Sequence, residues 1–493
     1  MCHAVAKARR EAAERHDAQD READAGMDGG RRMSAARPLP RAGDVAAIGA
    51  DPMAWLADAR ARHGDLFALD MVGPLLSRDD DCAQVIAVFG EAHQRAVLGD
   101  IERFVLPASA AVRLGLPAPL VQLNASLHGM RGDAHAQAKA QLARALARAD
   151  AERIGAAARQ AVDAGFATCD ADDWSLLETM RRVTLAASTS LLFGDVAIDG
   201  FDPAAVMDYF RLRREAAAPW AALDDTAREA LVRSGLALDD GLRRYRAAVR
   251  AAPREAAMFG ALAALALDGA IDDDAFVGHA NVLAVSTNEP VAVAMAWTLL
   301  ALSQMPVLRA RLRADDGRFD PAAALSQEML ADAVLSESLR VLTPNALMVR
   351  TTRTAATLGG HRLPAHTEVL LCPFLSHREP SLFREPERFL PARWADLRPS
   401  PYVYFPFGAG GHVCVGRALA LRLLRALLAA LSARGDALLC EDVAIDWRVH
   451  VMLLPTCDPR MRLVACGDTG DARRGGMLHG GIRDIVTLRD DGS

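Results

Sequence analysis

The sequence has neither the charge for nucleic-acid binding nor a long uninterrupted apolar run. Its 57 basic and 63 acidic side chains give a net charge of −6, which excludes the basic surface that duplex binding needs. The most apolar stretch, 282–302, is interrupted by Ser-Thr-Asn-Glu-Pro at 286–290, so a run of eighteen apolar residues is lacking. We therefore expect no nucleic-acid partner and no membrane span.

Paired cysteines are also lacking. The cysteines are scattered, none forms a C-x-x-C pair, and no secretory leader pattern precedes them. This distribution indicates a reducing, cytoplasmic compartment and leaves a single cysteine free for chemistry. The eight positions are 2, 82, 169, 372, 414, 440, 457 and 466.

Three regions differ in composition. The chain as a whole is 51% hydrophobic and 24% charged, which is typical of a soluble protein with a large core. Residues 1–36 alternate charges with alanine and predict a disordered or loosely helical arm, or a misassigned start with Met27 or Met33 as the true one. Residues 467–493 are rich in glycine and aspartate and predict a flexible tail. The remaining 37–466 shows no compositional break and predicts one large domain.

The periodicity of the body favours helix. Most of its long segments carry apolar residues at the 3.6-residue helical period, whereas strand-like segments are short and cluster at 65–88 and 348–373. No repeat of fixed period is present. The sequence therefore predicts a mainly α fold with small β-sheets. The clearest helical segments are 137–147, 174–193, 225–250, 275–312, 323–342 and 416–433.

The most informative stretch is a glycine-rich loop, 405–417, that leads into one of these helices. Its spacing fits neither G-x-G-x-x-G nor G-x-x-x-x-G-K-[ST], which argues against phosphate binding. Cys414 lies just before the helix N-terminus, where free N–H groups stabilise a thiolate, and His412 can reach an anionic group on a ligand. Such a thiolate suits haem iron as an axial ligand. Glycines that let the backbone approach a flat ligand stand at 408, 410, 411 and 416.

The loop contains the pattern F-x-x-G-x-H-x-C-x-G, which resembles the haem-binding signature of the cytochrome P-450 superfamily. The resemblance extends over 37–466. It implies the cytochrome P-450 fold, a single large domain with haem b between two long helices, and Cys414 as the axial ligand of the iron. The residues that form the pattern are Phe407, Gly410, His412, Cys414 and Gly416.

A second motif supports the resemblance. Glu337 and Arg340 match the family's E-x-x-R; three residues apart on a helix, they share a face and can form an ion pair. Alone this spacing is typical of solvated surface pairs. Arg388, in Pro-Glu-Arg-Phe at 386–389, falls where the resemblance implies a second arginine. The three residues would form a buried structural triad that holds the cysteine loop to the helical core.

A third set of residues would bind the haem propionates. His135 and Lys139 are four residues apart and share a helix face. The family usually has arginine where Lys139 stands; lysine keeps the charge but loses the bidentate geometry. The resemblance adds Arg350 and His412, which gives four donors for two carboxylates.

The helix expected over the haem, 275–305, departs from the family pattern. Counting back from Trp297 against A-G-x-[DE]-T-T places Pro290 at the first threonine, so the hydroxyl that orders water beside bound dioxygen is missing. Proline lacks the N–H for the Ser286 carbonyl and bends the helix directly. An alternative is a register error that hides the usual threonine. Besides ordered water or a substrate hydroxyl, the candidates for proton delivery are Thr287, Asn288 and Glu289.

The resemblance implies a soluble haem-thiolate monooxygenase that inserts one oxygen atom from dioxygen into a lipophilic small molecule, such as a natural-product intermediate or fatty acyl compound, free or bound to a carrier protein. Because the chain shows no flavin or iron–sulfur module, electrons would come from a separate ferredoxin or flavodoxin and its reductase, and NAD(P)H would act only indirectly. A monomer is expected. The implied pocket walls are Phe104, Val105, Leu283, Ser286, Ala346, Leu347, Val451 and Met452.

Two alternatives stay open. The same fold could act as a peroxygenase, isomerase or dehydratase, which the proline at 290 favours. From a different class, the domain could bind haem and recruit a carrier protein without turnover.

Overall fold

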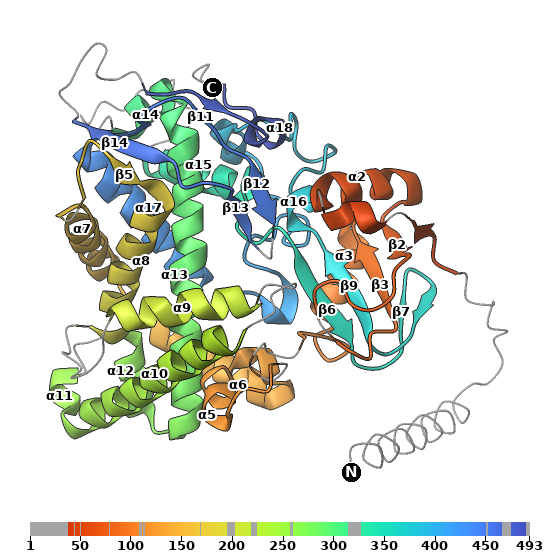
Figure 1. The fold of residues 1–493 in the computed structure, drawn as a ribbon, viewed down its shortest axis with the longest axis horizontal. Helices are drawn as coiled ribbons and strands as arrows, with labels where there is room; N and C mark the ends of the chain where they lie inside the picture. Colours follow the sequence, from red (N-terminus) through yellow and green to blue (C-terminus); the bar gives the residue numbers. More distant parts are fainter. Residues whose placement is uncertain are drawn as a thin grey trace.

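The computed structural model consists of a large helical part and a smaller part that holds a six-stranded sheet (Figure 1). This is the mainly α fold with small sheets that the sequence predicts. The predicted arm at 1–36 lies outside the described residues. The structure describes residues 38–43, 45–49, 51–77, 79–107, 111, 114–167, 169–194, 203–217, 224–256, 260–313, 327–449, 452–465 and 475–489.

Helix α13 (Asp273–Ser303) runs through the middle of the helical part, and α8 (Leu176–Phe193) packs along it (Figure 1). The surrounding helices bury their apolar stripes against these two helices or against one another, as α9 does against α10. They are α5 (Ala118–Leu123), α6 (Gly132–Leu146), α7 (Ala151–Ala167), α9 (Pro203–Ala217), α10 (Asp225–Ala251), α11 (Pro253–Ala256), α12 (Ala261–Asp268), α14 (Pro306–Arg313), α15 (Gln327–Val341) and α17 (Arg417–Arg434).

Helix α13 begins where the Asp272 side chain caps it, accepting a hydrogen bond from the backbone N–H of Ala275 at 2.7 Å. It continues through Pro290 without a break. By length and composition alone α13 could cross a membrane, since its most apolar window has a mean hydropathy of 1.2, but 67% of that window is buried inside the molecule. A core helix meets the same test, so the expectation of no membrane span stays a prediction.

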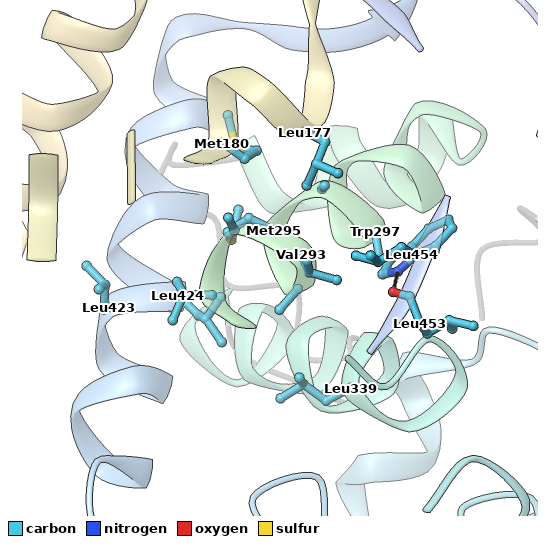
Figure 2. Packing of buried hydrophobic residues seen from close by; sticks show 14 of the residues in the cluster. Leu177, Met180, Val293, Met295, Trp297, Leu339, Leu423, Leu424, Leu453 and Leu454 are labelled. Carbon is cyan, nitrogen blue, oxygen red and sulfur yellow. Dashed lines mark hydrogen bonds between the residues drawn. The ribbon is translucent and has the colours of Figure 1, made fainter. Parts of the chain in front are cut away.

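Helix α13 and its neighbours share one large hydrophobic core. Figure 2 shows Trp297 of α13 against β13 (Leu453–Pro455), with its indole N–H donating to the Leu453 carbonyl at 3.0 Å. Leucines of α15 and α17 close the other side of the cluster. Each such buried side chain contributes roughly 1.5–3 kcal/mol to the stability of the fold relative to an exposed one. The packing of these side chains therefore holds α15 and α17, which flank the cysteine loop in the sequence, against α13.

The six-stranded sheet has the order β1-β2-β3-β9-β6-β4. Its central strands are buried on both faces, as in β9 and β3. Strand β6 pairs antiparallel with β9, which places Arg350 opposite Val369. The strands are β1 (Arg41–Ala42), β2 (Leu66–Leu69), β3 (Gln84–Val88), β4 (Phe104–Val105), β6 (Met348–Thr352) and β9 (Thr367–Leu371).

The remaining elements are short. Three-stranded β10-β14-β5 and the pairs β7-β8, β11-β15 and β12-β13 complete the strands. These strands are β5 (Trp174–Ser175), β7 (Ala356–Leu358), β8 (His361–Leu363), β10 (Asp436–Leu439), β11 (Val443–Ala444), β12 (Trp447–Val449), β14 (Arg460–Val464) and β15 (Leu478–His479). The short helices are η1 (Val45–Gly49), α2 (Pro52–His63), α3 (Glu91–Gly99), η2 (Leu127–Gly129), α16 (Pro373–Ser376), η3 (Pro391–Ala395), η4 (Gly410–His412) and α18 (Ile482–Ile485).

The prediction of a flexible C-terminal tail is wrong for residues 475–489. Strand β15 pairs with β11, and the backbone of Thr487 exchanges hydrogen bonds with Glu387 and Phe389 at 2.8 and 3.0 Å. Buried Arg378 also donates to the Ile485 carbonyl at 2.7 Å. Glycines and aspartates dominate the composition of this segment, but its few apolar residues are buried against the rest of the protein. They are Leu478, Ile482, Ile485, Val486 and Leu488.

We predict that Ile482→Ala lowers the free energy of unfolding by about 2–5 kcal/mol, because it opens a cavity under a fully buried side chain. Denaturant unfolding followed by circular dichroism measures this. Met477→Ala is the matched control, since that side chain is 52% exposed and should change stability by less than about 0.5 kcal/mol. Equal stability of the two variants would mean that the segment does not support the fold.

Candidate functional site

Cys414 lies in a loop that its own backbone closes. Its N–H donates to the Phe407 carbonyl at 2.9 Å, and the N–H of Val413 donates to the Gly410 carbonyl at 3.1 Å. Gly416 caps α17, whose first turn begins at Arg417, three residues after Cys414. The thiol is exposed on one side and is not in a disulfide. The loop therefore presents a sulfur outward on a rigid turn.

The pKa of the Cys414 thiol is raised by burial and lowered by nearby N–H groups and cations. Burial of the loop raises the pKa of Cys414 above its usual value and is the larger influence. The backbone N–H groups of Gly416 and Arg417 and the charge of Lys139 lower it. The stabilising groups that the sequence predicts are thus present but do not suffice alone. A cation bound at the sulfur would complete the thiolate, because a metal-bound thiol is deprotonated.

Two glycines of the loop have a purpose that the sequence does not suggest. Gly410 has a φ of +66°, and a Cβ there would overlap the carbonyl oxygen of Leu98 at the end of α3. A Cβ on Gly411 would lie 2.8 Å from Ile101 Cδ1. These glycines permit close packing of the loop on the end of α3 and on Ile101, and their part in the approach of a ligand stays a prediction. At Gly416 a Cβ would meet the Cys414 sulfur at 3.8 Å, an ordinary contact.

Arg350 is a buried cation without a buried anion. It projects from β6, is 3% exposed, and its Nη1 donates to its neighbour's carbonyl, that of Val349, at 2.8 Å. Among the described residues no carboxylate lies within ion-pair distance of it. Burial lowers the pKa of Arg350 to about 10. Because an uncompensated buried charge is costly, this guanidinium fits a site for an anionic ligand.

The other three predicted propionate donors meet at the cysteine loop. The rings of His135, on α6, and His412, in η4, have centroids 4.8 Å apart at nearly a right angle. Lys139 donates to the Gly411 carbonyl at 2.6 Å. Burial and the neighbouring lysine lower the pKa of His135, so its neutral form is favoured. Lys139 thus braces the loop, which the sequence did not predict for it.

The carboxylate of Glu337 is fully buried and receives hydrogen bonds from several groups. Arg340 binds it with two N–H groups at 2.8 and 2.9 Å. The Leu390 backbone N–H donates to it at 2.8 Å, and the Trp394 indole N–H at 2.9 Å. Burying the charge is tolerable because so many donors surround it.

The third member of this network is Arg393, and the assignment of Arg388 is wrong. Arg393 Nε lies 3.0 Å from the Glu337 carboxylate. The guanidinium of Arg388 instead lies 3.3 Å from Glu385, and only its backbone carbonyl joins the network, by accepting from Arg340. The turn of η3 brings Arg393 back over α15. Each arginine follows a proline by two residues, so the local sequence could not distinguish them.

A histidine that the sequence assigned no role connects this network to the cysteine loop. Arg340 donates to the His377 carbonyl at 3.0 Å, and the His377 ring nitrogen Nε2 accepts from the Phe405 N–H at 3.0 Å. Burial, together with the charges of Arg340 and Arg378, lowers the pKa of His377 to about 3. The ring is therefore neutral and remains an acceptor at the start of the loop.

Glu289 does not face the site as predicted. Arg181 of α8 binds its carboxylate with two N–H groups at 2.6 and 3.0 Å, and Arg214 of α9 lies 2.8 Å away. Asn288 likewise turns to α8, donating to the Arg181 carbonyl at 3.2 Å and to Thr184 at 3.3 Å. Both residues therefore join α13 to its neighbours, and their proposed part in proton delivery has no support in this geometry.

Residues on another face of α13 remain candidates. The Thr287 hydroxyl donates to the Leu283 and Ala284 carbonyls at 2.8 and 3.2 Å, as is common for threonine within helices. Ser286 and Pro290 are four residues apart and share a face. Within the described residues the Ser286 hydroxyl has no hydrogen-bond partner, and its side chain is exposed.

The predicted pocket walls fall into two groups. Phe104 packs in the hydrophobic cluster of the sheet with Leu98 and Phe405, and its assignment as a wall stays a prediction. Val451 lies outside the described residues. The segments around Ala346 and Met452 do lie together, because Asn345 bridges to Met452. Four of the other predicted walls are buried, namely Val105 on β4, Leu283 on α13, and Ala346 and Leu347 before β6, whereas Ser286 on α13 is exposed.

The chain is similar to known proteins over these elements. A family model described as cytochrome P-450 matches residues 268–443. Cyclooctat-9-en-7-ol 5-monooxygenase of Streptomyces melanosporofaciens is 31% identical over 33% of this chain and 38% of its own length. The mitochondrial 25-hydroxyvitamin D-1 alpha hydroxylase of Rattus norvegicus is 34% identical over 31% of this chain and 32% of its own length. This chain thus spans about a third of each curated relative.

A solved structure extends the similarity to the whole fold. The retinoic-acid-bound cyanobacterial CYP120A1 has a TM-score of 0.68 to this structure. The match covers 87% of this chain and 99% of that protein, at 18% sequence identity. The arrangement of helices and sheets is therefore that of the cytochrome P-450 fold.

We predict that Arg393→Ala lowers the free energy of unfolding by about 3–5 kcal/mol, because it removes one partner of a fully buried carboxylate. Guanidinium denaturation measures the loss. Arg384→Ala, at a side chain 92% exposed, should change stability by less than about 0.5 kcal/mol. A larger loss for Arg388→Ala than for Arg393→Ala would return the third position to Arg388.

Proposed function

Because this chain is a member of the cytochrome P-450 superfamily, we propose that it is a haem-thiolate monooxygenase that inserts one oxygen atom from dioxygen into a lipophilic small molecule. One observation carries the proposal: a loop presents the Cys414 thiol outward, while the buried Arg350 has no carboxylate among the described residues. A ligand with a metal at its centre and carboxylates at its edge satisfies both. Haem b is such a ligand.

The residues at hand fit this group. Cys414 Sγ would bind the iron, and the side chains of His135, Lys139, Arg350 and His412 would donate hydrogen bonds to the propionates. When bound, haem supplies the binding and reduction of dioxygen and the oxidation of a C–H bond. Phe407 and the glycines at 410 and 416 form the loop that holds the sulfur in place.

The chain's own contribution to proton delivery falls to the face of α13 that carries Ser286 and Pro290. The Ser286 hydroxyl can hold a proton and a water molecule, since it is bound to no described residue. Glu289 is engaged by Arg181 and Arg214, so its carboxylate serves to position α9 and α8. A hydroxyl on the substrate could take the place of the missing threonine.

The remaining parts of the reaction come from outside the chain. We propose that a separate ferredoxin or flavodoxin with its NAD(P)H reductase supplies two electrons, and that the protein acts as a cytoplasmic monomer in secondary metabolism. The six described cysteines are all free thiols, which supports a reducing compartment. The two relatives described above, a monooxygenase and a hydroxylase, support oxygen insertion.

A second function has one specific observation in its favour. The proline at 290 removes the threonine hydroxyl, and the acid before it is held by arginines. Such a site suits chemistry that does not need the usual protonation of dioxygen, as in a peroxygenase, isomerase or dehydratase. Product formed with hydrogen peroxide alone, and none with electrons and dioxygen, would favour this function over monooxygenation.

We predict that Cys414→Ser abolishes the carbon monoxide difference band of a thiolate-ligated ferrous haem, because an alcohol cannot replace the thiolate donor. The spectrum is recorded on protein expressed with added haem precursor and reduced with dithionite. Cys440→Ser, at another exposed free cysteine, should leave the band unchanged. A colourless wild-type protein, or an unaltered band in Cys414→Ser, would overturn the proposed function.

We predict that Pro290→Thr changes the partition of electrons between product and hydrogen peroxide by about tenfold or less, in favour of product, since a hydroxyl then orders water at the site. Peroxide release per NAD(P)H consumed is the measurement. Val291→Thr, whose side chain is buried one position along α13, is the matched control. Unchanged leakage in Pro290→Thr would remove the argument that the substrate assists protonation.

A further inference from the structure

A cavity of about 140 Å³ lies between α5, α9, α10 and α13. Most of its wall is apolar. Leu114 comes from the loop before α5, Leu231 from α10 and Val282 from α13. This volume holds several water molecules, or a small head group with the first part of a chain. A mostly apolar cavity with a few polar groups is the usual form of a small-molecule site.

Three polar side chains meet on one wall of this cavity. Asn124 at the end of α5 accepts a hydrogen bond from Arg213 Nε at 2.9 Å. Its amide nitrogen lies 3.0 Å from the Tyr209 hydroxyl and donates to the Leu120 carbonyl at 2.8 Å. Asn124 thus fixes the orientation of Arg213, because both ends of its amide are engaged. The terminal nitrogens of the guanidinium are left for another partner.

The charge of Arg213 is not balanced by the described protein. No carboxylate within the described ranges lies at ion-pair distance from it, whereas the neighbouring arginines of α9 are paired. Arg211 lies 3.2 Å from Glu215 on the exposed side, and Arg214 lies 2.8 Å from Glu289. Burial lowers the pKa of Arg213, with Tyr209 as the opposing influence. A cation held in an apolar cavity without an anion is costly unless a ligand supplies one.

We propose that this cavity binds the carboxylate head of an otherwise apolar substrate, with Arg213 as its counter-ion. Val282 of the cavity wall precedes Ser286 by one turn of α13, so the two are roughly 6 Å apart along the helix axis. The apolar part of a molecule anchored at Arg213 can therefore extend along α13 toward the site described above. This proposal rests on the proposed function and names its substrate class.

The test measures binding to the haem-loaded protein by calorimetry and by the shift of the haem spectrum. The probes are matched sets of a carboxylic acid, its methyl ester and its primary alcohol, built on straight-chain, terpenoid and aromatic skeletons. We expect at least one skeleton for which the acid binds about tenfold or more tightly than both neutral partners, since hydrogen bonds to a charged partner contribute that much.

Two variants and a control assign the preference to one side chain. Arg213→Gln should abolish the preference for the acid while leaving the affinity for the ester within about threefold. Arg213→Glu should reverse the charge preference, so that the primary amine of the same skeleton, added as a fourth probe for this variant, binds more tightly than the acid. Arg211→Gln, two residues away on the exposed face of α9, should bind all the probes as the wild type does. The carbon monoxide difference band, recorded on each variant, reports the haem site separately.

The outcomes separate this proposal from the proposed function. A wild-type protein with a normal band that prefers no acid on any skeleton would overturn the carboxylate site alone. An unchanged preference in Arg213→Gln would do the same, because the anion would then be held elsewhere. Absence of the band in the wild type would overturn the haem function, and calorimetry would still report whether the acids bind at Arg213.

Discussion

The structure depends on one buried carboxylate, that of Glu337. Charge in a protein interior is tolerated only when donors surround it, and here two arginines, an indole and a backbone N–H do so. Each donor comes from a segment that must therefore fold around α15. Through Arg340 and the neutral ring of His377 the same network reaches Phe405, where the cysteine loop begins. The ion pair of Glu337 and Arg340 thus helps to position the loop that carries the sulfur, although it is far from Cys414 in the sequence.

The sequence predicted the parts of the site whose spacing is local. The cysteine pattern, the E-x-x-R pair on one helix face and the helical pair His135 and Lys139 depend only on distances along the chain. The predictions that were wrong concern side chains whose partners lie far away in the sequence. Glu289 was assigned to chemistry, but two arginines from other helices bind it. Arg393 was overlooked in favour of Arg388, because only the turn of η3 decides between them.

Composition misled at the C-terminus for a related reason. A segment rich in glycine and aspartate has too few apolar residues to form a core of its own, which is why it reads as a tail. It docks because β11 and the region around Phe389 offer unpaired backbone groups and a prepared apolar surface. A short segment needs only a few buried side chains when its backbone hydrogen bonds are made with an existing fold. Such dependence on the rest of the chain is not visible in the segment itself.

Burial and pairing together distinguish two kinds of arginine in this protein. Arg340 and Arg393 are buried beside the Glu337 carboxylate, and this ion pairing within the chain compensates the cost of desolvating their charges. Arg350 and Arg213 lie in apolar surroundings without one among the described residues, so the cost of desolvating each charge remains until an anion arrives. Arg213 lies in the wall of a cavity that has room for a small molecule, and Arg350 is the cation that the proposed function assigns to a propionate. A buried arginine without a carboxylate thus indicates a ligand site. An apolar lining alone could not distinguish such a site from a packing defect.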